Sequence, residues 1–326
     1  MKVLVTGGAG YIGSHTVRQL HGAGHDVVVL DTLEFGRREA VGDTPFVQGD
    51  TGDTALVERV LRDERIEAVI HFAAYKSVGD SMQQPGRYFQ NNVCGTLNLL
   101  TAMTQAQVKY IVFSSTCAVY GTPETLPVSE TNAIHPESVY GETKVMVERL
   151  LHWFDATTGL RSAALRYFNA AGASFDATLG EDWTYTLNLV PLVMKAALGH
   201  LPTLKIFGSD YPTSDGTAIR DYIHVVDLAD AHVKALEFLQ REDRSDVFNL
   251  GTGHGSSVQQ IINAAREVSG LPIPVEYAER RPGDPVASWA DNTKARTLLG
   301  WTPQYGLREI VETAWQWHHT HHGFAK

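Results

Sequence analysis

The sequence predicts an α/β fold with a doubly wound parallel sheet. In the first half of the chain, short apolar runs alternate with segments whose apolar residues recur every three or four positions. The short runs are apolar throughout, which is typical of strands buried on both faces. Strands that alternate with helices require crossover connections, so a parallel sheet with helices on both sides is expected.

The expected elements follow one another in a regular order. The run 26–31 (DVVVLD) is β-branched and too short for a helix, whereas 54–65 carries its apolar residues on one helical face. The expected strands are 2–6, 26–31, 45–48, 68–72 and 110–114, and the expected helices are 11–23, 54–65 and 87–105.

The regular alternation ends near residue 170. Gly, Asp and Pro gather at 172–182 and again at 208–216, which is typical of irregular connections. A helix at 227–240 and a short strand at 247–250 follow, so we expect a second, smaller α/β domain that is not separated by one clean boundary. The predicted domains are 1–170, with segments near 222–250 returning to it, and 171–326.

Length and composition exclude several classes of protein. The 326 residues exceed what one core needs, and 43% hydrophobic with 20% charged residues is typical of a globular protein. The net charge of −10 argues against a nucleic-acid-binding surface. Cys94 and Cys117 form no CxxC pair, so we expect a reducing, cytoplasmic location. No signal-peptide core is found, and no run approaches the ~20 apolar residues of a membrane span.

The turn after the first strand carries a glycine pattern. Its glycines permit a tight turn, let backbone N–H groups approach a pyrophosphate, and let the next helix pack close to the strand. The N-terminus of that helix then faces the phosphates. Because the pattern lies between a strand and a helix, it predicts a Rossmann-type dinucleotide site rather than a plain turn. The turn reads Thr6, Gly7, Gly8, Ala9, Gly10, Tyr11, Ile12, Gly13.

An acidic residue completes the dinucleotide pattern. Asp31 ends the second strand about 20 residues after Gly10, at the offset expected for a carboxylate that bonds the adenosine ribose. A carboxylate repels a 2′-phosphate, so Asp31 favours NAD over NADP. Arg37 and Arg38 lie nearby and keep NADP open as an alternative.

Tyr140 and Lys144 lie one helical turn apart in the predicted helix 138–156. A free phenol has a pKa of about 10 and is a poor base at neutral pH. A nearby ammonium lowers that pKa, and an oxidised, cationic nicotinamide acts in the same direction. The pair is therefore suited to take a proton from an alcohol while hydride leaves for a cofactor. The alternative is a surface pair without chemistry.

A second Val-Tyr-Gly stretch contains Tyr120, which is followed four residues later by Glu124. A carboxylate raises the pKa of a phenol, and the prolines at 123 and 127 disfavour a helix here. We interpret Tyr120 as a packing residue or a pocket wall. The hydroxyl cluster at 114–116 ends the fifth strand, where ligands of open parallel sheets bind, and this favours chemistry at Tyr140.

These motifs resemble the extended short-chain dehydrogenase/reductase superfamily and, more closely, its UDP-glucose 4-epimerase (UDP-galactose 4-epimerase) family. The resemblance covers nearly the whole chain, and the stretch at 207–225 is the most specific, because generic dehydrogenases lack this substrate half. The matching stretches are TGGAGYIGSHT at 6–16, HFAA at 71–74, NNVCGT at 91–96, FSSTCAVYG at 113–121, YGETK at 140–144, RYFNAAGA at 166–173, FGSDYPTSDGTAIRDYIHV at 207–225 and RRPGD at 280–284.

The resemblance implies reversible C4 epimerisation of UDP-glucose and UDP-galactose with an NAD that stays bound and is not consumed. It implies that Tyr140 takes the proton of the sugar 4-hydroxyl as hydride leaves C4. The 4-keto sugar then turns over, and hydride returns to its other face. Thr116, where many relatives carry Ser, is expected to bond the C4 oxygen, and Lys144 to hold the nicotinamide ribose and tune Tyr140.

The family pattern also implies the binding residues. The NAD site is expected to comprise Gly7, Gly10, Tyr11, Ile12, Gly13, Asp31, Thr32, Asp50, Thr51, Phe72, Ala73, Ala74, Lys76, Asn92, Tyr140, Lys144 and Phe168. The nucleotide-sugar site is expected to comprise Thr116, Tyr140, Asn169, Asn188, Leu189, Lys205, Ile206, Phe207, Arg220, Arg281, Asp284 and Ser288. Arginines can clamp a diphosphate, and an aspartate can accept ribose hydroxyls. Without the family pattern, surface arginines in a loop-rich domain are the alternative.

Two departures from the family pattern affect the expected binding. Phe35-Gly36 replaces polar residues that often follow the ribose-binding acid, so contacts to the adenosine end are expected to differ. Ser288 stands where some relatives carry tyrosine beside the sugar. A small side chain enlarges the pocket, so UDP-N-acetylhexosamines are expected as further substrates.

Three rival functions are compatible with a dinucleotide-binding fold of this kind. Dehydratases of the superfamily carry Asp-Glu after the threonine, and Cys117-Ala118 here disfavours that reaction. An epimerase or decarboxylase acting on UDP-glucuronate or another nucleotide sugar stays open. A non-catalytic NAD-binding sensor also stays open, although such a protein has no need of Tyr140 and Lys144.

The remaining expectations concern assembly and the C-terminus. The family resemblance implies a homodimer through helices 87–105 and 138–156. The histidine-rich stretch 318–322 is predicted to be a frayed, solvated tail rather than a metal site. The predicted partners are a UDP-hexose and a second copy of the chain, and no nucleic acid, membrane or metal is expected.

Overall fold

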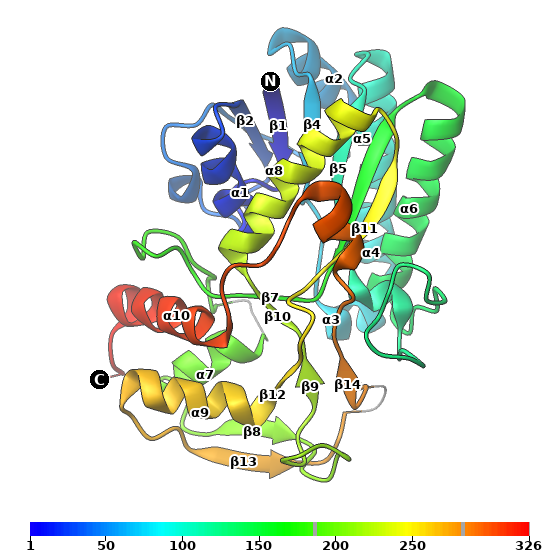
Figure 1. The fold of residues 1–326 in the computed structure, drawn as a ribbon. Helices are drawn as coiled ribbons and strands as arrows, with labels where there is room; N and C mark the ends of the chain where they lie inside the picture. The colour runs from blue at the N-terminus through cyan, green and yellow to red at the C-terminus, as the bar shows by residue number, and fades with distance from the viewer. Residues whose placement is uncertain (185–187, 282–283, 326) are drawn as a thin grey trace.

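Seven parallel strands form the centre of the computed structural model, which describes residues 1–184, 188–281 and 284–325 (Figure 1). The strand order is β11-β6-β5-β4-β1-β2-β3. The strands are β1 (Lys2–Thr6), β2 (Asp26–Asp31), β3 (Phe46–Gln48), β4 (Ala68–His71), β5 (Tyr110–Thr116), β6 (Arg161–Tyr167) and β11 (Asp246–Leu250). The order reverses beside β1, as in a doubly wound sheet, so the predicted fold class is confirmed.

Helices cover both faces of this sheet. On one face lie α1 (Tyr11–Gly22) and α8 (Val225–Glu242), which pack against each other. On the other lie α2 (Thr54–Asp63), α5 (Gly95–Gln105) and α6 (Val139–Thr158). Because β11 pairs with β6 and α8 packs on the central sheet, the chain returns to this sheet after residue 220.

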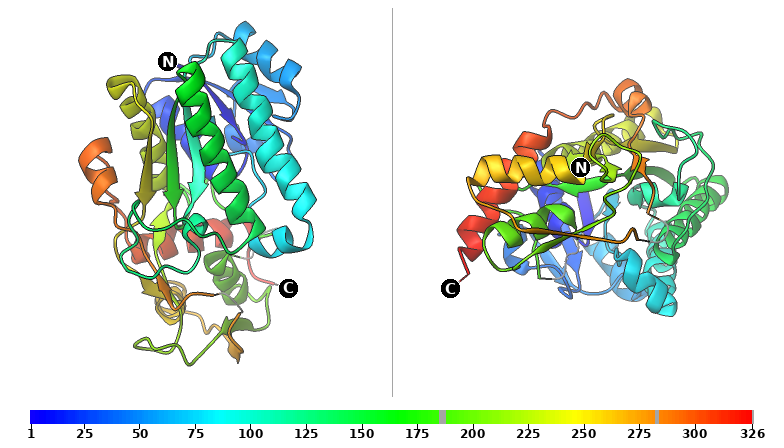
Figure 2. Two further views of the ribbon diagram at one scale, coloured as in Figure 1. Left: turned by 90° about the vertical axis from the view of Figure 1, so that its right-hand side faces the viewer. Right: turned by 90° about the horizontal axis from the view of Figure 1, so that it is seen from below.

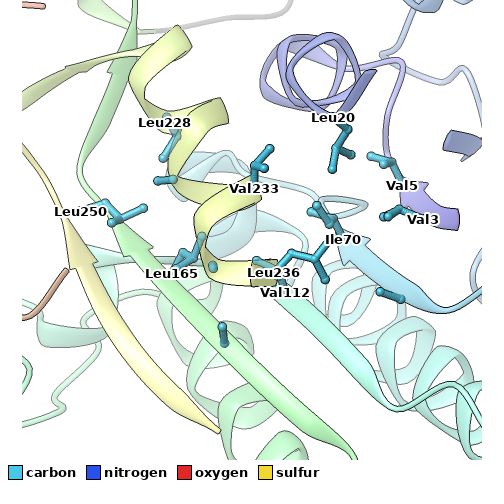
Figure 3. Packing of buried hydrophobic residues seen from close by; sticks show 14 of the residues in the cluster. Val3, Val5, Leu20, Ile70, Val112, Leu165, Leu228, Val233, Leu236 and Leu250 are labelled. Carbon is cyan, nitrogen blue, oxygen red and sulfur yellow. The ribbon is translucent and has the colours of Figure 1, made fainter. Parts of the chain in front are cut away.

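The apolar runs of the strands are explained by this double cover. Val3 and Val5 of β1 pack toward α1 and α8, whereas Leu4 between them packs toward α2 and α5. Figure 3 shows Val3, Val5 and Ile70 of the sheet facing Leu20 of α1 in the first cluster. Each such buried side chain contributes about 1.5–3 kcal/mol of hydrophobic free energy.

A smaller group of elements lies beyond the carboxyl ends of the sheet strands (Figures 1 and 2). Its helices α7 (Leu189–Ala197), α9 (Val258–Ser269) and α10 (Leu307–His322) share a third hydrophobic cluster. Its strand pairs are β8 (Leu204–Phe207) with β13 (Val275–Ala278), β9 (Ile219–Arg220) with β12 (Ser256–Ser257) and β14 (Ala287–Ser288), and β7 (Asn169–Ala171) with β10 (Tyr222–His224).

Two differences from the expected elements lie close to the sheet edge. The expected helix 87–105 is α4 (Pro85–Tyr88), a π-helical stretch (Phe89–Cys94) and α5, and within the π-helical stretch Asn92 Oδ1 accepts the Tyr75 N–H of the loop after β4 at 2.9 Å. Helical periodicity in a sequence does not reveal such a wider turn. β5 continues through Thr116, because its pairing with β6 extends to Thr116 and Tyr167.

The prediction of a frayed C-terminal tail was wrong. The helix α10 continues through His322, and the Trp183 ring stacks with His318 at 4.7 Å and His322 at 3.9 Å between ring centroids. His318 is buried, and burial lowers its pKa to about 3. Nowhere in the described ranges do three His, Cys, Asp or Glu side chains group together as a metal site, and no described helix is long and apolar enough to cross a membrane.

Candidate active site

The glycine loop joins β1 to α1 with almost no space around it. Gly7 has φ +72°, and a Cβ there would lie 2.6 Å from the backbone nitrogen of Ala73. A Cβ on Gly13 would lie 2.8 Å from Cα of Gly8 and would meet the Gly7 carbonyl. Gly10 begins α1 without a side-chain cap, so the first N–H groups of the helix face outward toward the loop. This cradle suits a pyrophosphate.

Asp31 lies beside the glycine loop, as the sequence predicts. Its Oδ2 accepts a hydrogen bond from the Ala9 N–H at 3.0 Å, and its Oδ1 accepts one from the Leu33 N–H at 2.8 Å. Burial raises the pKa of Asp31, and these two N–H groups oppose that change. The neighbouring strand end brings Asp50 to the same edge, where its carboxylate accepts the Gly52 N–H at 2.7 Å.

The loops after β2 and β4 contact each other in a way that the sequence did not reveal. The Tyr75 hydroxyl donates to Oε2 of Glu34 at 2.8 Å, and Glu34 also pairs with Arg87. The Arg87 guanidinium lies 4.3 Å from the centre of the Tyr75 ring, and the Phe35 ring meets Tyr75 edge-on at 6.0 Å. The unusual Phe35 was the only signal in the sequence.

Lys76 and Asn188 come from different predicted sets and meet at one carboxylate. Lys76 Nζ lies 3.0 Å from Oε1 of Glu181, and Asn188 Nδ2 donates to the same oxygen at 2.8 Å. The Glu181 side chain is buried. Glu181 therefore connects the cofactor half to the sugar half, although no motif in the sequence marks it.

Asn92 and Phe168 of the predicted NAD set are both buried. Asn92 accepts the Tyr75 N–H through Oδ1 at 2.9 Å and donates through Nδ2 to the Thr143 hydroxyl at 3.1 Å. Phe168 packs in a cluster with Val119 and Tyr120. These contacts hold the loop after β4 and the end of β6 in place around the site.

Tyr140, Lys144 and Thr116 lie together at the carboxyl end of β5. The Tyr140 hydroxyl lies close to the Thr116 hydroxyl. Lys144 Nζ donates to the Ser114 carbonyl at 2.7 Å and lies 5.9 Å from the centre of the Tyr140 ring. The N-cap Ser138 begins α6 by accepting the Gly141 N–H at 3.1 Å. The helix thus presents both predicted groups to one strand end.

In the structure, Lys144 does not bring the pKa of Tyr140 below its ordinary value. Desolvation raises the pKa of Tyr140, and the neighbouring Tyr167 adds to this, whereas the nearby Thr116 hydroxyl lowers it. Burial lowers the pKa of Lys144 to about 7, and Glu148 opposes that change. The expectation considered charge alone, and desolvation of both groups is the larger effect. A further positive charge close to the ring would favour the phenolate.

Tyr120 has a different environment from Tyr140. Its ring is buried, whereas Tyr140 keeps part of its surface exposed. The Tyr120 hydroxyl donates to Oδ1 of Asn249 at 2.7 Å and accepts Nη1 of Arg166 at 2.8 Å. Burial raises its pKa to about 12, and burial rather than Glu124 is the main cause. The interpretation of Tyr120 as a packing residue agrees with these contacts.

Several residues of the predicted nucleotide-sugar set converge around β9 and β14. Arg220 forms an ion pair with Asp284 and is the register partner of Ser288. Nearby, the Arg281 guanidinium lies 3.9 Å from the centre of the Phe207 ring. Pro282 and Gly283, which complete the RRPGD stretch, lie outside the described residues.

The other members of this set differ in accessibility. The Ile206 side chain is buried in the third hydrophobic cluster, so only its main chain can face a ligand. Lys205 before it is exposed. Asn169 donates to the Asp221 carbonyl at 3.1 Å, and Leu189 begins α7.

A cavity of about 400 Å³ lies next to the glycine loop. Its walls include Tyr11, Phe35 and Arg37 on one side and Asp182 with Trp317 of α10 on the other. It is therefore a feature of the cofactor end, and neither Tyr140 nor Lys144 lines it. The contribution of α10 was not predicted from the sequence.

Comparison with known proteins finds relatives that are named as epimerases. The model of the "NAD dependent epimerase/dehydratase family" matches residues 3–251. The UDP-glucose 4-epimerase of Lactobacillus helveticus is 50% identical over 98% of both chains. The structure of UDP-glucose-4-epimerase from Stenotrophomonas maltophila, with bound NAD and formylated UDP-arabinopyranose, has a TM-score of 0.96 and 43% identity over 98% of both chains. The UDP-Glc/GlcNAc 4-epimerase of Campylobacter jejuni has a TM-score of 0.87 and 42% identity, covering 98% of this chain and 99% of that one.

Proposed function

Because this chain belongs to the NAD dependent epimerase/dehydratase family, we propose that it interconverts UDP-glucose and UDP-galactose at C4. One observation carries the proposal: Tyr140, Lys144 and Thr116 meet at the end of β5, beside a glycine cradle. In a doubly wound sheet this edge is where a dinucleotide and its substrate meet.

The residues around the glycine loop fit NAD. Gly7 and Gly13 leave no room for a side chain, the start of α1 offers N–H groups, and Asp31 offers carboxylate oxygens beside them. We propose that NAD binds the residues that the family pattern predicts for the NAD site. These residues lie in the domain formed by 1–170 and the returning segment near 222–250. When bound, NAD supplies the hydride acceptor and donor at C4, and its oxidised ring adds a positive charge.

Tyr140 is the proposed base. Its side chain is partly exposed and lies close to Thr116, so the C4 hydroxyl of a sugar can hydrogen-bond to both hydroxyls. Lys144, fixed on the Ser114 carbonyl, places an ammonium close to the phenol ring. Tyr140 would take the C4 hydroxyl proton as hydride leaves C4 and would return it to the C4 oxygen when hydride comes back to the other face, while Thr116 keeps the C4 oxygen oriented.

The sugar nucleotide is assigned to the remainder of 171–326. Arg220 and Arg281 are the proposed diphosphate contacts, and Asp284 both orients Arg220 and offers oxygens to a ribose. Ser288 neighbours Arg220 in the small sheet and has a short side chain, which supports N-acetylated UDP-hexoses as further substrates. The Campylobacter jejuni relative, named for both sugars, adds support.

Dehydration is disfavoured by the residues that follow Thr116. Cys117 is the only titratable side chain of the Cys117-Ala118 pair. Burial raises the pKa of Cys117 to about 12, so its thiol is neutral at physiological pH and does not serve as a base.

Two further proposals concern assembly and location. Leu97 of α5 and Met146 and Trp153 of α6 expose 39%, 38% and 64% of their surfaces, and the two helices contact each other. Large apolar side chains exposed on neighbouring helices favour an interface, and we propose a homodimer formed through α5 and α6. Cys94 and Cys117 are both free thiols, which supports a reducing, cytoplasmic location.

The function is tested by supplying purified protein with UDP-galactose and no added NAD. Formation of UDP-glucose, together with NAD released from the denatured protein, is the expected result. UDP-N-acetylgalactosamine and UDP-glucuronate are tested in parallel; turnover of the first is expected and of the second is not. Bound NAD without any product would contradict the proposal and favour a sensor.

A further inference from the structure

Glu148 lies on the same face of α6 as Tyr140 and Lys144, one turn further along the helix. Its Oε1 accepts the Ser115 hydroxyl at 2.6 Å. Lys144 donates to the Ser114 carbonyl, and Tyr140 lies close to Thr116. Three successive turns of the helix therefore face three adjacent residues at the end of β5, and two of them are hydrogen-bonded to it.

The Glu148 carboxylate is held from the neighbouring strand as well. Arg166 of β6 donates through Nε to Oε1 of Glu148 at 2.9 Å, and its Nη2 donates to the other oxygen. Arg166 is the register partner of Ser115, so both residues sit side by side under the carboxylate. The guanidinium is almost buried and also reaches the Tyr120 hydroxyl. A two-point contact of this kind has a defined geometry.

The charges that face Lys144 come from a small number of groups. Tyr140 and Glu148 lie on its own helix, and His71 faces it from β4. Burial lowers the pKa of His71 to about 3, so this ring is neutral at physiological pH. Behind Glu148 lies the cation of Arg166. Glu148 is therefore the anion that stabilises the Lys144 ammonium, against the burial that disfavours it.

We propose that Glu148 is a positioning residue of this site: it fixes the register of α6 on β5 and places a negative charge one helical turn from Lys144. The proposal rests on the epimerase function given above. Loss of the contact lets the first turns of α6 shift, and a displacement of about 1 Å at a reacting group is enough to slow a reaction strongly.

The test compares Glu148→Gln with Asp155→Asn in the holoprotein. Asp155 also joins α6 to β6, through Arg161, but lies near the far end of the helix. Glu148→Gln is expected to lower kcat by about tenfold or more with little change in KM. It also lowers the pKa of Lys144 further, so the ammonium is lost earlier as pH rises and the alkaline limb of kcat moves to lower pH. Asp155→Asn is expected to lower Tm and to leave kcat and its pH dependence unchanged.

A second readout does not depend on activity. Amide hydrogen exchange in residues 139–147 is expected to be faster in Glu148→Gln than in Asp155→Asn, because only the first variant frees the helix from β5. A wild type without turnover would count against the proposed function, and the exchange would still decide the role of Glu148. Equal exchange and unchanged pH limbs in the two variants would overturn the proposal.

Glu148→Gln leaves the buried Arg166 without an anion, which is costly, so this variant can fail to fold. In that case Glu148→Asp tests the positioning role. The shorter carboxylate keeps the charge but does not span both Ser115 and Arg166. We expect a lower kcat with the pH limbs in place. A Glu148→Asp enzyme with the wild-type kcat would refute the positioning role.

Discussion

Tyr140 and Tyr120 follow the same Val-Tyr-Gly sequence, and their neighbours give them different roles. Tyr140 is partly exposed and lies close to Thr116. Tyr120 is buried, and its hydroxyl is hydrogen-bonded to both Asn249 and Arg166. In the sequence, the two tyrosines differ in the residue four positions later, which is Glu124 after Tyr120 and Lys144 after Tyr140. In the structure, burial has a larger effect on the pKa of each tyrosine than these charges have.

This difference predicts opposite results for one substitution at the two positions. Tyr140→Phe removes the proposed base and is expected to lower kcat by about 10²–10⁴-fold with little change in Tm. Tyr120→Phe removes only packing hydrogen bonds; it is expected to cost about 1–3 kcal/mol of stability while most activity remains. Initial rates and thermal denaturation of both variants decide this. Full activity of Tyr140→Phe would end its assignment as the base.

At the level of elements, the predicted binding of NAD depends on the close packing at the start of α1. Gly13 faces the Gly7 carbonyl across the turn, whereas the space around Gly22, at the end of the same helix, is open. Gly13→Ala is expected to cost about 1–3 kcal/mol and to weaken NAD retention, because backbone has to move. Gly22→Ala is expected to be neutral or stabilising, by at most about 1 kcal/mol.

Bound NAD after gel filtration and Tm are the measurements for this pair. The matched variants change the same residue type in the same helix, so helix propensity alone does not separate them. A Gly13→Ala protein that keeps both its NAD and its stability would show that the close packing of this turn is not required.

The elements were predictable where their signal is local. Apolar runs and helical periodicity are properties of neighbouring residues, so every strand expected in 2–114 lies in the sheet. The Glu181 contacts with Lys76 and Asn188 join distant segments, and no short pattern encodes them. For the same reason, the packing of α10 against Trp183 was missed.

At the scale of the whole molecule, the family pattern supplied the sugar-binding set, and physical reasoning from the residues supplied the cofactor cradle and the Tyr140–Lys144 pair. The structure brings Arg220, Asp284 and Ser288 together, although they are distant in sequence. It also shows that Ile206 faces the core. Long-range convergence of this kind is visible only once the fold is known.

The proposed homodimer gives a prediction at this scale. Trp153→Arg places a charge at the most exposed of the three apolar side chains of α5 and α6 and is expected to shift the protein from dimer to monomer at micromolar concentration. Tyr277→Arg on β13, where the ring is similarly exposed at 53%, is the control and is expected to leave a dimer. Light scattering after gel filtration measures both masses. A Trp153→Arg dimer would contradict this interface.

In the proposed reaction, hydrogen leaves C4 of the sugar and returns to it inside the protein. UDP-galactose that carries deuterium at C4, incubated with the protein in ordinary water, tests this step. We expect UDP-glucose that retains the deuterium at C4, because hydride held on a bound cofactor does not exchange with solvent. Loss of the deuterium to water during turnover would contradict it.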